Sequence, residues 1–174
     1  MAAEPRELEL MLTPRSRYDA IDVAGRVAQT HGDALAEYRR VAYCSFHTTA
    51  GYLEQSLCSR LEHSRDRLDP FVGAFRRLFP AGAEYRHDCL DERAELSEES
   101  RKCEPKNGDS HLAFISAGLR NCVTYVNRPG EPVYFVDLDG TNEDVARERR
   151  TRLLAFNREE LVERTTWDVP VSAH

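Results

Sequence analysis

The chain alternates short apolar runs with amphipathic stretches, a pattern typical of strands mixed with helices. Every second residue is apolar near the N-terminus, where Leu8, Leu10 and Leu12 predict a first strand. A continuous apolar run from Val41 to Phe46 predicts a buried strand. The predicted strands cover residues 8–12, 15–21, 41–46, 122–126, 133–138 and 149–156. The loop 127–131, which contains Pro-Gly, predicts that the strands at 122–126 and 133–138 form a hairpin.

Apolar residues recur at helical spacing in four other places. The predicted helices run from Asp22, as the capping residue, to about Tyr38, from Tyr52 to Ser64, from near Asp69-Pro70 onward, and from His111 to Ala117. Asp109 or Ser110 can cap the last of these helices, and Gly118 can end it. Strands and helices in irregular order predict an α+β fold.

Between Asp91 and Lys106 the chain is rich in charged residues and serine and holds few apolar ones. Apolar segments resume directly afterwards, so we expect an exposed excursion at about 91–106 within a single domain spanning residues 1–174. Such a segment lacks the side chains to bury itself.

Composition narrows the possible functions. The net charge of −6 argues against a general nucleic-acid binder, and the arginines of 147–152, interleaved with acids, indicate a solvated face. No apolar run approaches the roughly 20 residues that a membrane helix needs. Acidic residues near Met1 argue against a signal peptide, so we expect a cytoplasmic protein.

The cysteine count gives a similar indication. Five cysteines without a Cys-x-x-Cys pair fit a reducing compartment better than a disulfide scaffold. Cys44 and Cys122 lie in strand-like apolar runs, where a small buried hydrophobe is the expected role.

Three histidines occupy unusual settings: His47 ends a predicted strand, His87 follows a turn, and His111 opens a predicted helix. Imidazole transfers protons near neutral pH and is a common metal ligand. Three converging imidazoles would suit a catalytic zinc ion with an open fourth position. Spacing alone does not show that they meet, and a single histidine is more often a hydrogen-bonded structural residue.

The stretch His47-Thr48-Thr49-Ala50-Gly51 is predicted to lie where a strand passes into a helix. The two hydroxyls and the free amides of a helix N-terminus would suit a phosphate or carboxylate group. The alternative is an ordinary turn in which a hydroxyl caps the helix. The sequence holds neither a Walker loop nor a dinucleotide fingerprint, so we expect no nucleotide cofactor.

Four motifs in order resemble the YjbQ family, also labelled secondary thiamine-phosphate synthase enzymes. They are His47-Thr-Thr-Ala-Gly51, Tyr85-x-His87-Asp88, Asn107-x-x-x-His111-Leu112 with Gly118 beyond it, and Asp137-Leu-Asp139-Gly140. In the last motif Asp137 stands where the family usually has Glu. The family's Gly-x-Trp-Gln element is missing before Asp137, so the resemblance is to a divergent member.

The resemblance implies a YjbQ-like two-sheet β-sandwich with helices, mostly antiparallel, assembled as a homotrimer. It also implies a pocket lined by the three histidines, which serves either a metal ion or acid/base chemistry. The implied catalytic residues are His47, His87, His111, Asp88 and Asp137. Thr48, Thr49 and Asn107 would form a rim for an anion or phosphate, and Asp88 or Asp137 would fix the tautomer of a histidine.

Three functions remain open. The family label implies an enzyme that joins a pyrimidine diphosphate to a thiazole phosphate, with magnesium on the diphosphate substrate. The second is a zinc-dependent hydrolase of a small phosphorylated or carboxylated metabolite, with the zinc held by the three histidines. The third is a trimeric module that binds such a metabolite without catalysis. None of the three involves nucleic acid or a membrane.

Overall fold

The computed structural model describes residues 3–142 and 145–157. Its strands are β1 (Arg6–Leu12), β2 (Asp19–Asp22), β3 (Arg40–Ser45), β4 (Ala50–Gly51), β5 (Cys122–Val126), β6 (Tyr134–Asp137), β7 (Thr141–Asn142), β8 (Val145–Ala146) and β9 (Arg149–Phe156). Its α-helices are α1 (Val23–His31), α2 (Gln55–Arg60), α3 (Arg65–Leu78), α4 (Glu98–Cys103) and α5 (Gly108–Ser116). Two single 3₁₀ turns, Arg86–Asp88 and Leu90–Glu92, precede α4.

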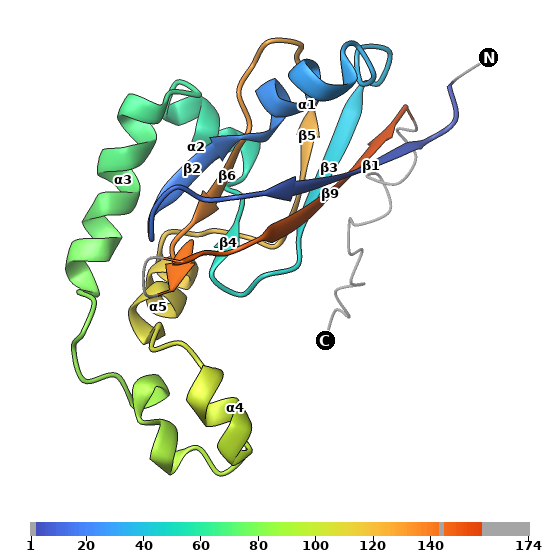
Figure 1. Cartoon of the computed structure of the whole chain (residues 1–174). Coiled ribbons are helices and arrows are strands. Elements are labelled where there is room, and N and C mark those ends of the chain that lie inside the picture. The colour runs from blue at the N-terminus through green and yellow to red at the C-terminus, as the bar shows by residue number, and fades with distance from the viewer. Residues whose placement is uncertain (1–2, 143–144, 158–174) are drawn as a thin grey trace, which may run out of the picture.

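The strands form two principal antiparallel sheets (Figure 1). One sheet has the order β1-β9-β3-β5, and the other has the order β2-β6-β4. The first strand of the chain therefore lies beside the last, and Leu8 is opposite Leu153. These sheets with their flanking helices confirm the predicted α+β class and its antiparallel character.

Aromatic rings fill the core between the sheets. Tyr43 of β3 packs on Tyr52 with ring centroids 5.5 Å apart, and Tyr52 packs edge-on against Phe135 of β6 at 5.4 Å. Along β9 every second side chain is buried, which places Leu153 and Ala155 in the same core. Edge-to-face rings at these distances add to the free energy of burial.

Three helix boundaries differ from the predicted ones. Asp22 caps α1 as predicted, but α1 ends at His31 because Gly32 adopts a φ of 56°. Helix α2 ends at Arg60, since Glu62 and His63 both have positive φ. Helix α3 begins at Arg65, well before the predicted start, and carries Pro70 inside it.

The predicted hairpin of 122–126 with 133–138 is wrong, because β5 and β6 belong to different sheets. Hydrogen bonds at both ends of the segment that connects β5 to β6 hold it across the molecule. The Asn127 side-chain amide donates to the carbonyls of Leu35 and Tyr38, and the Asp22 carboxylate accepts from the amide of Val133. The short β7–β8 hairpin was not predicted.

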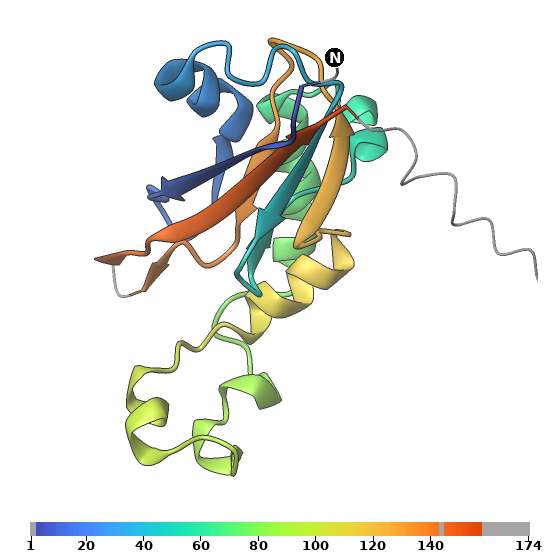
Figure 2. The same cartoon turned by 90° about the vertical axis from the view of Figure 1, so that its right-hand side faces the viewer.

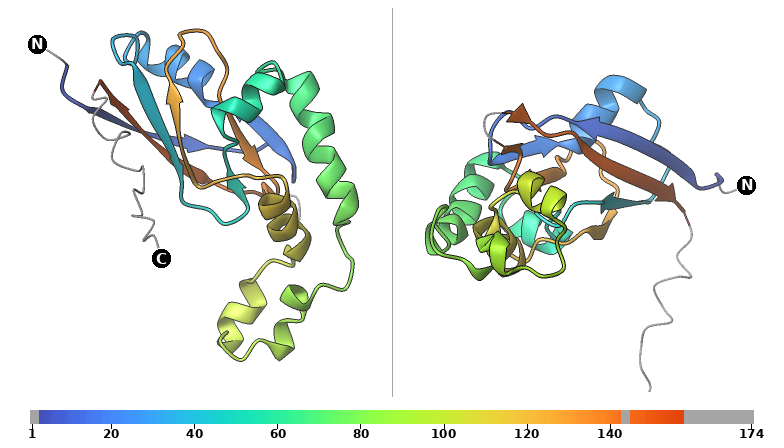
Figure 3. Two further views of the ribbon diagram at one scale, coloured as in Figure 1. Left: turned by 180° about the vertical axis from the view of Figure 1, so that it is seen from behind. Right: turned by 60° about the horizontal axis from the view of Figure 1, so that its bottom comes forward.

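Between α3 and α5 the chain leaves the body of the molecule and returns, forming a lobe that projects from it (Figure 2 and the left view of Figure 3). This excursion contains α4, which the sequence pattern did not predict, and most of its side chains are exposed. Among the described residues, no helix has both the length and the apolar character required to cross a bilayer.

The backbone at Gly51 of β4 lies very close to Arg120, just before β5. A Cβ at Gly51 would lie 2.4 Å from the carbonyl oxygen of Arg120, where Tyr52 and Arg120 exchange two backbone hydrogen bonds. We expect Gly51→Ala to lower the free energy of unfolding by about 1–3 kcal/mol, as other overpacked sites do.

Gly73 supplies the matched control. It lies inside α3, and a Cβ there meets nothing nearer than Arg77 at 3.4 Å. Gly73→Ala should raise the free energy of unfolding by about 0.5–1 kcal/mol. Urea denaturation measures both variants, and a Gly51→Ala protein as stable as the parent would contradict the packing described.

Candidate functional site

His87 and His111 lie together at the base of the excursion. Their ring centroids are 4.6 Å apart with the planes tilted by 43°. His87 lies on the 3₁₀ turn Arg86–Asp88, and His111 is the fourth residue of α5. Residues 24 apart in sequence are thus neighbours because both ends of the excursion meet here.

Asp88 joins the two elements that carry these histidines. Its Oδ1 accepts from His87 Nδ1 at 3.0 Å and from the amide of Gly108 at 2.9 Å. Gly108 is needed for this approach, since a Cβ there would lie 2.7 Å from Tyr85 Cβ. Because a carboxylate accepts this bond, Nδ1 of His87 carries a proton, and in the neutral tautomer with that proton Nε2 has a lone pair.

The N-terminus of α5 is tied to the end of β6 by buried polar contacts. Ser110 Oγ donates to the carbonyl of Leu138, and Asn107 Nδ2 donates to Asp139 Oδ2 at 2.7 Å. Asp139 also pairs with Arg147 at 3.1 Å. Asn107 is 5% exposed, and its Oδ1 accepts no hydrogen bond in the described structure. A buried acceptor without a partner is costly and points to a donor that a ligand or water would supply.

Asp137 contacts an arginine instead of a histidine. Its Oδ2 accepts from Arg149 Nε at 2.6 Å and its Oδ1 from Arg149 Nη2 at 3.1 Å. Both side chains are buried, which corrects the interpretation of 147–152 as a wholly solvated face. The alternation of β9 hides Arg149 while it exposes Arg150 and Arg152.

His47 is held by a separate contact. Its Nε2 accepts from the backbone amide of Arg150 at 2.9 Å, and its carbonyl accepts from the Asn121 side chain. Burial and the nearby charges of Arg149, Arg150 and Arg147 lower the pKa of His47. Burial, followed by the charge of His87, lowers the pKa of His111. Both shifts favour neutral imidazoles at pH 7.

The turn of His47-Thr48-Thr49 joins two strands, β3 and β4, and helix α2 begins only at Gln55. The helix amides expected behind the threonines are therefore absent from this place. Thr48 is exposed, whereas Thr49 is buried and its carbonyl accepts from the amide of Leu138. Local sequence could not distinguish the two arrangements, because β4 has only two residues.

A metal ion in this region would need three or more ligands from neighbouring side chains. Within residues 3–142 and 145–157, no three His, Cys, Asp or Glu residues are placed to hold a metal ion. His87 and His111 supply a pair of imidazoles, and His47 is engaged with Arg150. The three-histidine ligand set therefore does not fit within the described part of one chain.

A cavity of about 580 Å³ opens beside the arginines, between the end of the excursion and the β7–β8 hairpin. Arg147 and Arg149 line it together with Cys103 and Pro105. Sequence reasoning missed both arginines because the charge run suggested only a solvated face. This cavity borders the Asp139 and Asn107 contacts through Arg147.

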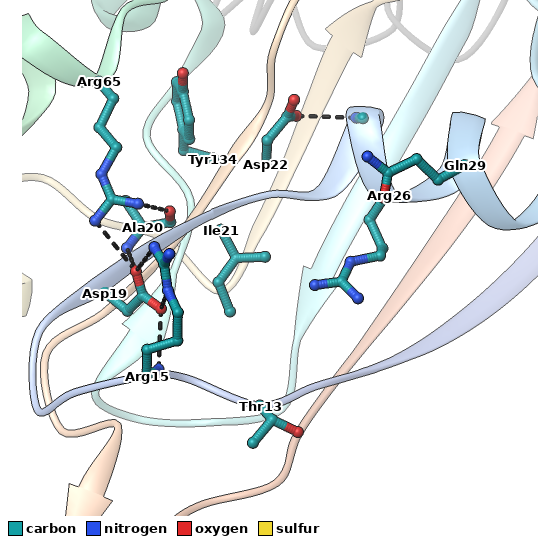
Figure 4. A pocket seen from close by; sticks show the side chains of 11 residues that line it. Thr13, Arg15, Asp19, Ala20, Ile21, Asp22, Arg26, Gln29, Arg65 and Tyr134 are labelled. Atoms are coloured by element: carbon teal, nitrogen blue, oxygen red, sulfur yellow. Dashed lines mark hydrogen bonds and ion pairs between the residues drawn. The ribbon is translucent and has the colours of Figure 1, made fainter.

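A second cavity, of about 410 Å³, lies over β2 and the start of α1 (Figure 4). Arg15 and Arg65 both contact Asp19 there, and Arg65 also pairs with Asp69. Figure 4 shows Arg26 on the other side of Ile21. No histidine lines this cavity. Arg65 of α3 donates to the Ala20 carbonyl as well as to Asp19, so it holds α3 against β2, whereas Arg15 pairs with Asp19 from the loop that precedes β2.

Comparison by sequence finds no matching family model and no matching curated protein. Comparison by structure does find similar proteins. A hypothetical protein from Aeropyrum pernix K1 superimposes with a TM-score of 0.57 at 18% identity, covering 88% of this chain and 99% of that one.

Two further solved structures carry a family description. A "YbjQ-like" protein of unknown function from Sulfolobus solfataricus P2 has a TM-score of 0.59 at 13% identity, over 89% of this chain and 99% of that one. An uncharacterised YjbQ/UPF0047 protein from Clostridium acetobutylicum has a TM-score of 0.54 at 16% identity, over 86% and 99%. The four ordered motifs and this agreement over most of the chain show that the protein has the YjbQ-like fold.

Proposed function

We propose that this protein is a divergent YjbQ-like enzyme that acts on a small phosphorylated metabolite at the His87–His111 pair. One observation carries the proposal. Two adjacent imidazoles, one with its tautomer fixed by Asp88, lie beside the N-terminus of α5, where Asn107 presents a buried, unpartnered acceptor. Perturbed titratable groups around an unsatisfied polar atom are typical of functional sites.

Proton transfer is the chemistry that these imidazoles suit. A neutral His87 ring that donates from Nδ1 to Asp88 can accept a proton at Nε2. The lowered pKa of His111 keeps its ring neutral beside His87, so the two rings do not repel each other as cations.

The anionic part of the substrate is assigned to the cavity that Arg147 and Arg149 line. Arg147 uses Nη1 for Asp139, and its side chain remains 24% exposed. A guanidinium has five donors in a planar fork, which suits phosphate oxygens. Arg149 would contribute chiefly through its charge, since its Nε and Nη2 already donate to Asp137 and Nη2 also donates to the Asp139 carbonyl.

The finer proposal is thiamine-phosphate synthase activity, which rests on the motif resemblance. In that reaction the methylene carbon on the pyrimidine forms a bond to the ring nitrogen of the thiazole phosphate, while its bond to the pyrophosphate oxygen breaks and pyrophosphate leaves. A magnesium ion would arrive on the diphosphate, and the leaving pyrophosphate would be stabilised by the arginines. The general proposal survives if another phosphorylated substrate proves to be the true one.

Activity with the two thiamine precursors and magnesium tests the finer proposal. We expect His111→Ala to reduce kcat/KM by about 10²-fold or more, the usual contribution of an acid/base group. His31→Ala is the matched control, because His31 is an exposed histidine at the end of α1. Equal rates for the two variants would remove the histidine pair from the mechanism, and binding of phosphorylated metabolites without turnover would indicate a binding module.

The neutral histidines also predict a pH dependence of stability. The pKa values of His47 and His111 are lowered in the folded protein, so the unfolded chain binds protons more readily. The free energy of unfolding should therefore fall as pH drops below about 6.5, the unfolded value. Urea denaturation at about pH 7.5 and about pH 5.5 measures the change.

His111→Asn should make that pH dependence shallower than in the parent protein, because it removes one of the two groups. His31→Asn serves as the control for the loss of a histidine at the surface. A folded-state titration of His111 by NMR at or above about pH 6.5 would contradict the assignment.

A zinc hydrolase is the second candidate, favoured by the closeness of the His87 and His111 rings. It needs a third ligand, which a neighbouring subunit of the expected homotrimer would have to supply. Elemental analysis of tag-free protein grown with zinc should then give about one zinc per chain, lost in His87→Ala. Metal-free protein that sediments as a monomer would count against both the zinc and the trimer, which stays a prediction.

A further inference from the structure

Two cysteines face each other across the edge of the larger sheet. Cys44 of β3 is directly opposite Cys122 of β5 in the antiparallel register. Cys122 is exposed and Cys44 is partly buried, so the expectation that both are buried was wrong. Both side chains alternate with core residues such as Tyr43 and Val123, which places them together on the outward face of the sheet. Figure 2 shows that face without a helix over it among the described residues.

The hydrogen-bond pattern fixes the type of this pair. Ser45 donates its amide to the carbonyl of Asn121 at 2.6 Å, so these two opposite residues form a hydrogen-bonded pair. Asn127 likewise donates to Arg39 at the other end of the ladder. Hydrogen-bonded and non-hydrogen-bonded pairs alternate along an antiparallel ladder, so Cys44 and Cys122 form a non-hydrogen-bonded pair. Val126 agrees, because its amide points away from β3 to the Gln55 side chain.

Non-hydrogen-bonded pairs bring Cα atoms to about 4.5 Å and their side chains close together. That separation lies at the short end of the Cα range of about 4.4–6.8 Å that disulfides span. Burial, and then a hydrogen bond and charge from Cys122, raise the pKa of the Cys44 thiol to about 12.

We propose that Cys44 and Cys122 form a thiol–disulfide site on the outward face of the sheet, which small-molecule disulfides oxidise to a cross-strand disulfide. Cross-strand bonds at the short end of the Cα range are strained, and strained, exposed disulfides are the ones that open and close readily. The site is separate from the histidine pair and does not depend on the proposed reaction.

The oxidation balances as a thiol–disulfide exchange. The Cys122 thiolate attacks one sulfur of the oxidised small disulfide, which forms a mixed disulfide and releases one small thiolate. The Cys44 thiol then gives its proton to a released small thiolate as its sulfur attacks Cys122 Sγ, which closes the cross-strand bond and releases the second small thiolate. The two protein protons pass to the two released thiolates, and the small disulfide takes up both electrons. Cys122 lines a surface cavity of about 360 Å³, which gives the reagent access.

The location connects this pair to His47. Ser45 follows Cys44 and accepts from the amide of His47, while Asn121 precedes Cys122 and holds the His47 carbonyl. A bond between Cys44 and Cys122 would fix the two strand ends to which His47 is hydrogen-bonded. Reduced and oxidised protein therefore differ in how firmly this turn is held.

Oxidised glutathione is the probe for the experiment. The Cys89→Ser/Cys103→Ser protein removes the two exposed cysteines of the excursion and retains Cys44, Cys58 and Cys122. After treatment we expect the mass of the protein to drop by two hydrogens, and subsequent alkylation should label one thiol instead of three. Cleavage by trypsin with a Glu-specific protease separates Cys44 from Cys58 at Glu54, so the linked peptide identifies the pair.

Single substitutions in this background complete the test. Cys122→Ser should keep both remaining thiols, and Cys44→Ser should retain glutathione on Cys122 as a mixed disulfide. The unaltered chain should give the same linked peptide, which guards against a folding defect in the variants. Glutathione that remains on Cys122 while Cys44 is present, a Cys122–Cys122 link between two chains, or no reaction would each overturn the proposal.

Discussion

The buried ion pair of Arg149 with Asp137 holds the two sheets together at the point where the site is built. Arg149 begins β9 of the larger sheet, and Asp137 ends β6 of the smaller one. In the smaller sheet Asp137 is opposite both Asp19 of β2 and Ala50 of β4. Removing one partner would leave a buried, uncompensated charge, which costs about 3–5 kcal/mol in other proteins. The pair therefore fixes the course of 137–139 relative to both sheets.

A short series of contacts connects His87 and His111 to this ion pair and fixes their positions. The Leu138 carbonyl accepts a hydrogen bond from Ser110 of α5, and Asp139 accepts one from Asn107, which directly precedes α5. Helix α5 in turn carries His111. Asp88 then attaches the His87 turn to the amide of Gly108. A site that needs fixed imidazoles gains from such support, because each ring is placed by hydrogen bonds within a packed frame. Its position at the edge of the sheets leaves both rings partly buried, and this burial lowers the pKa of His111.

Elements with strong periodicity could be predicted from the sequence, whereas contacts between elements could not. The strands predicted at 122–126 and 149–156 have the observed bounds of β5 and β9, although the apolar residues of 149–156 alternate poorly, and the capping role of Asp22 marked the start of α1. The local turn signal at 127–131 could not show that the Asn127 side chain binds carbonyls near residue 38 and so directs β6 into the other sheet. In the site, His87 and Asp88 are sequence neighbours, but Arg149 is buried only because β9 turns that side of the strand inward.

The geometry of the site does not depend on the length of the excursion that connects its two parts. Asp88 and Gly108 are joined at 2.9 Å, so the chain leaves and re-enters the body at one point. The entropy of closing a loop grows only with the logarithm of its length, so a longer or shorter excursion changes stability little. The constraint falls instead on the closing residues: Gly108 must lack a Cβ beside Tyr85, and Asp88 must accept from both the loop end and His87. Two of the four motifs that carry the resemblance contain these closing residues, which explains why they are recognisable on either side of a segment that has no such signal.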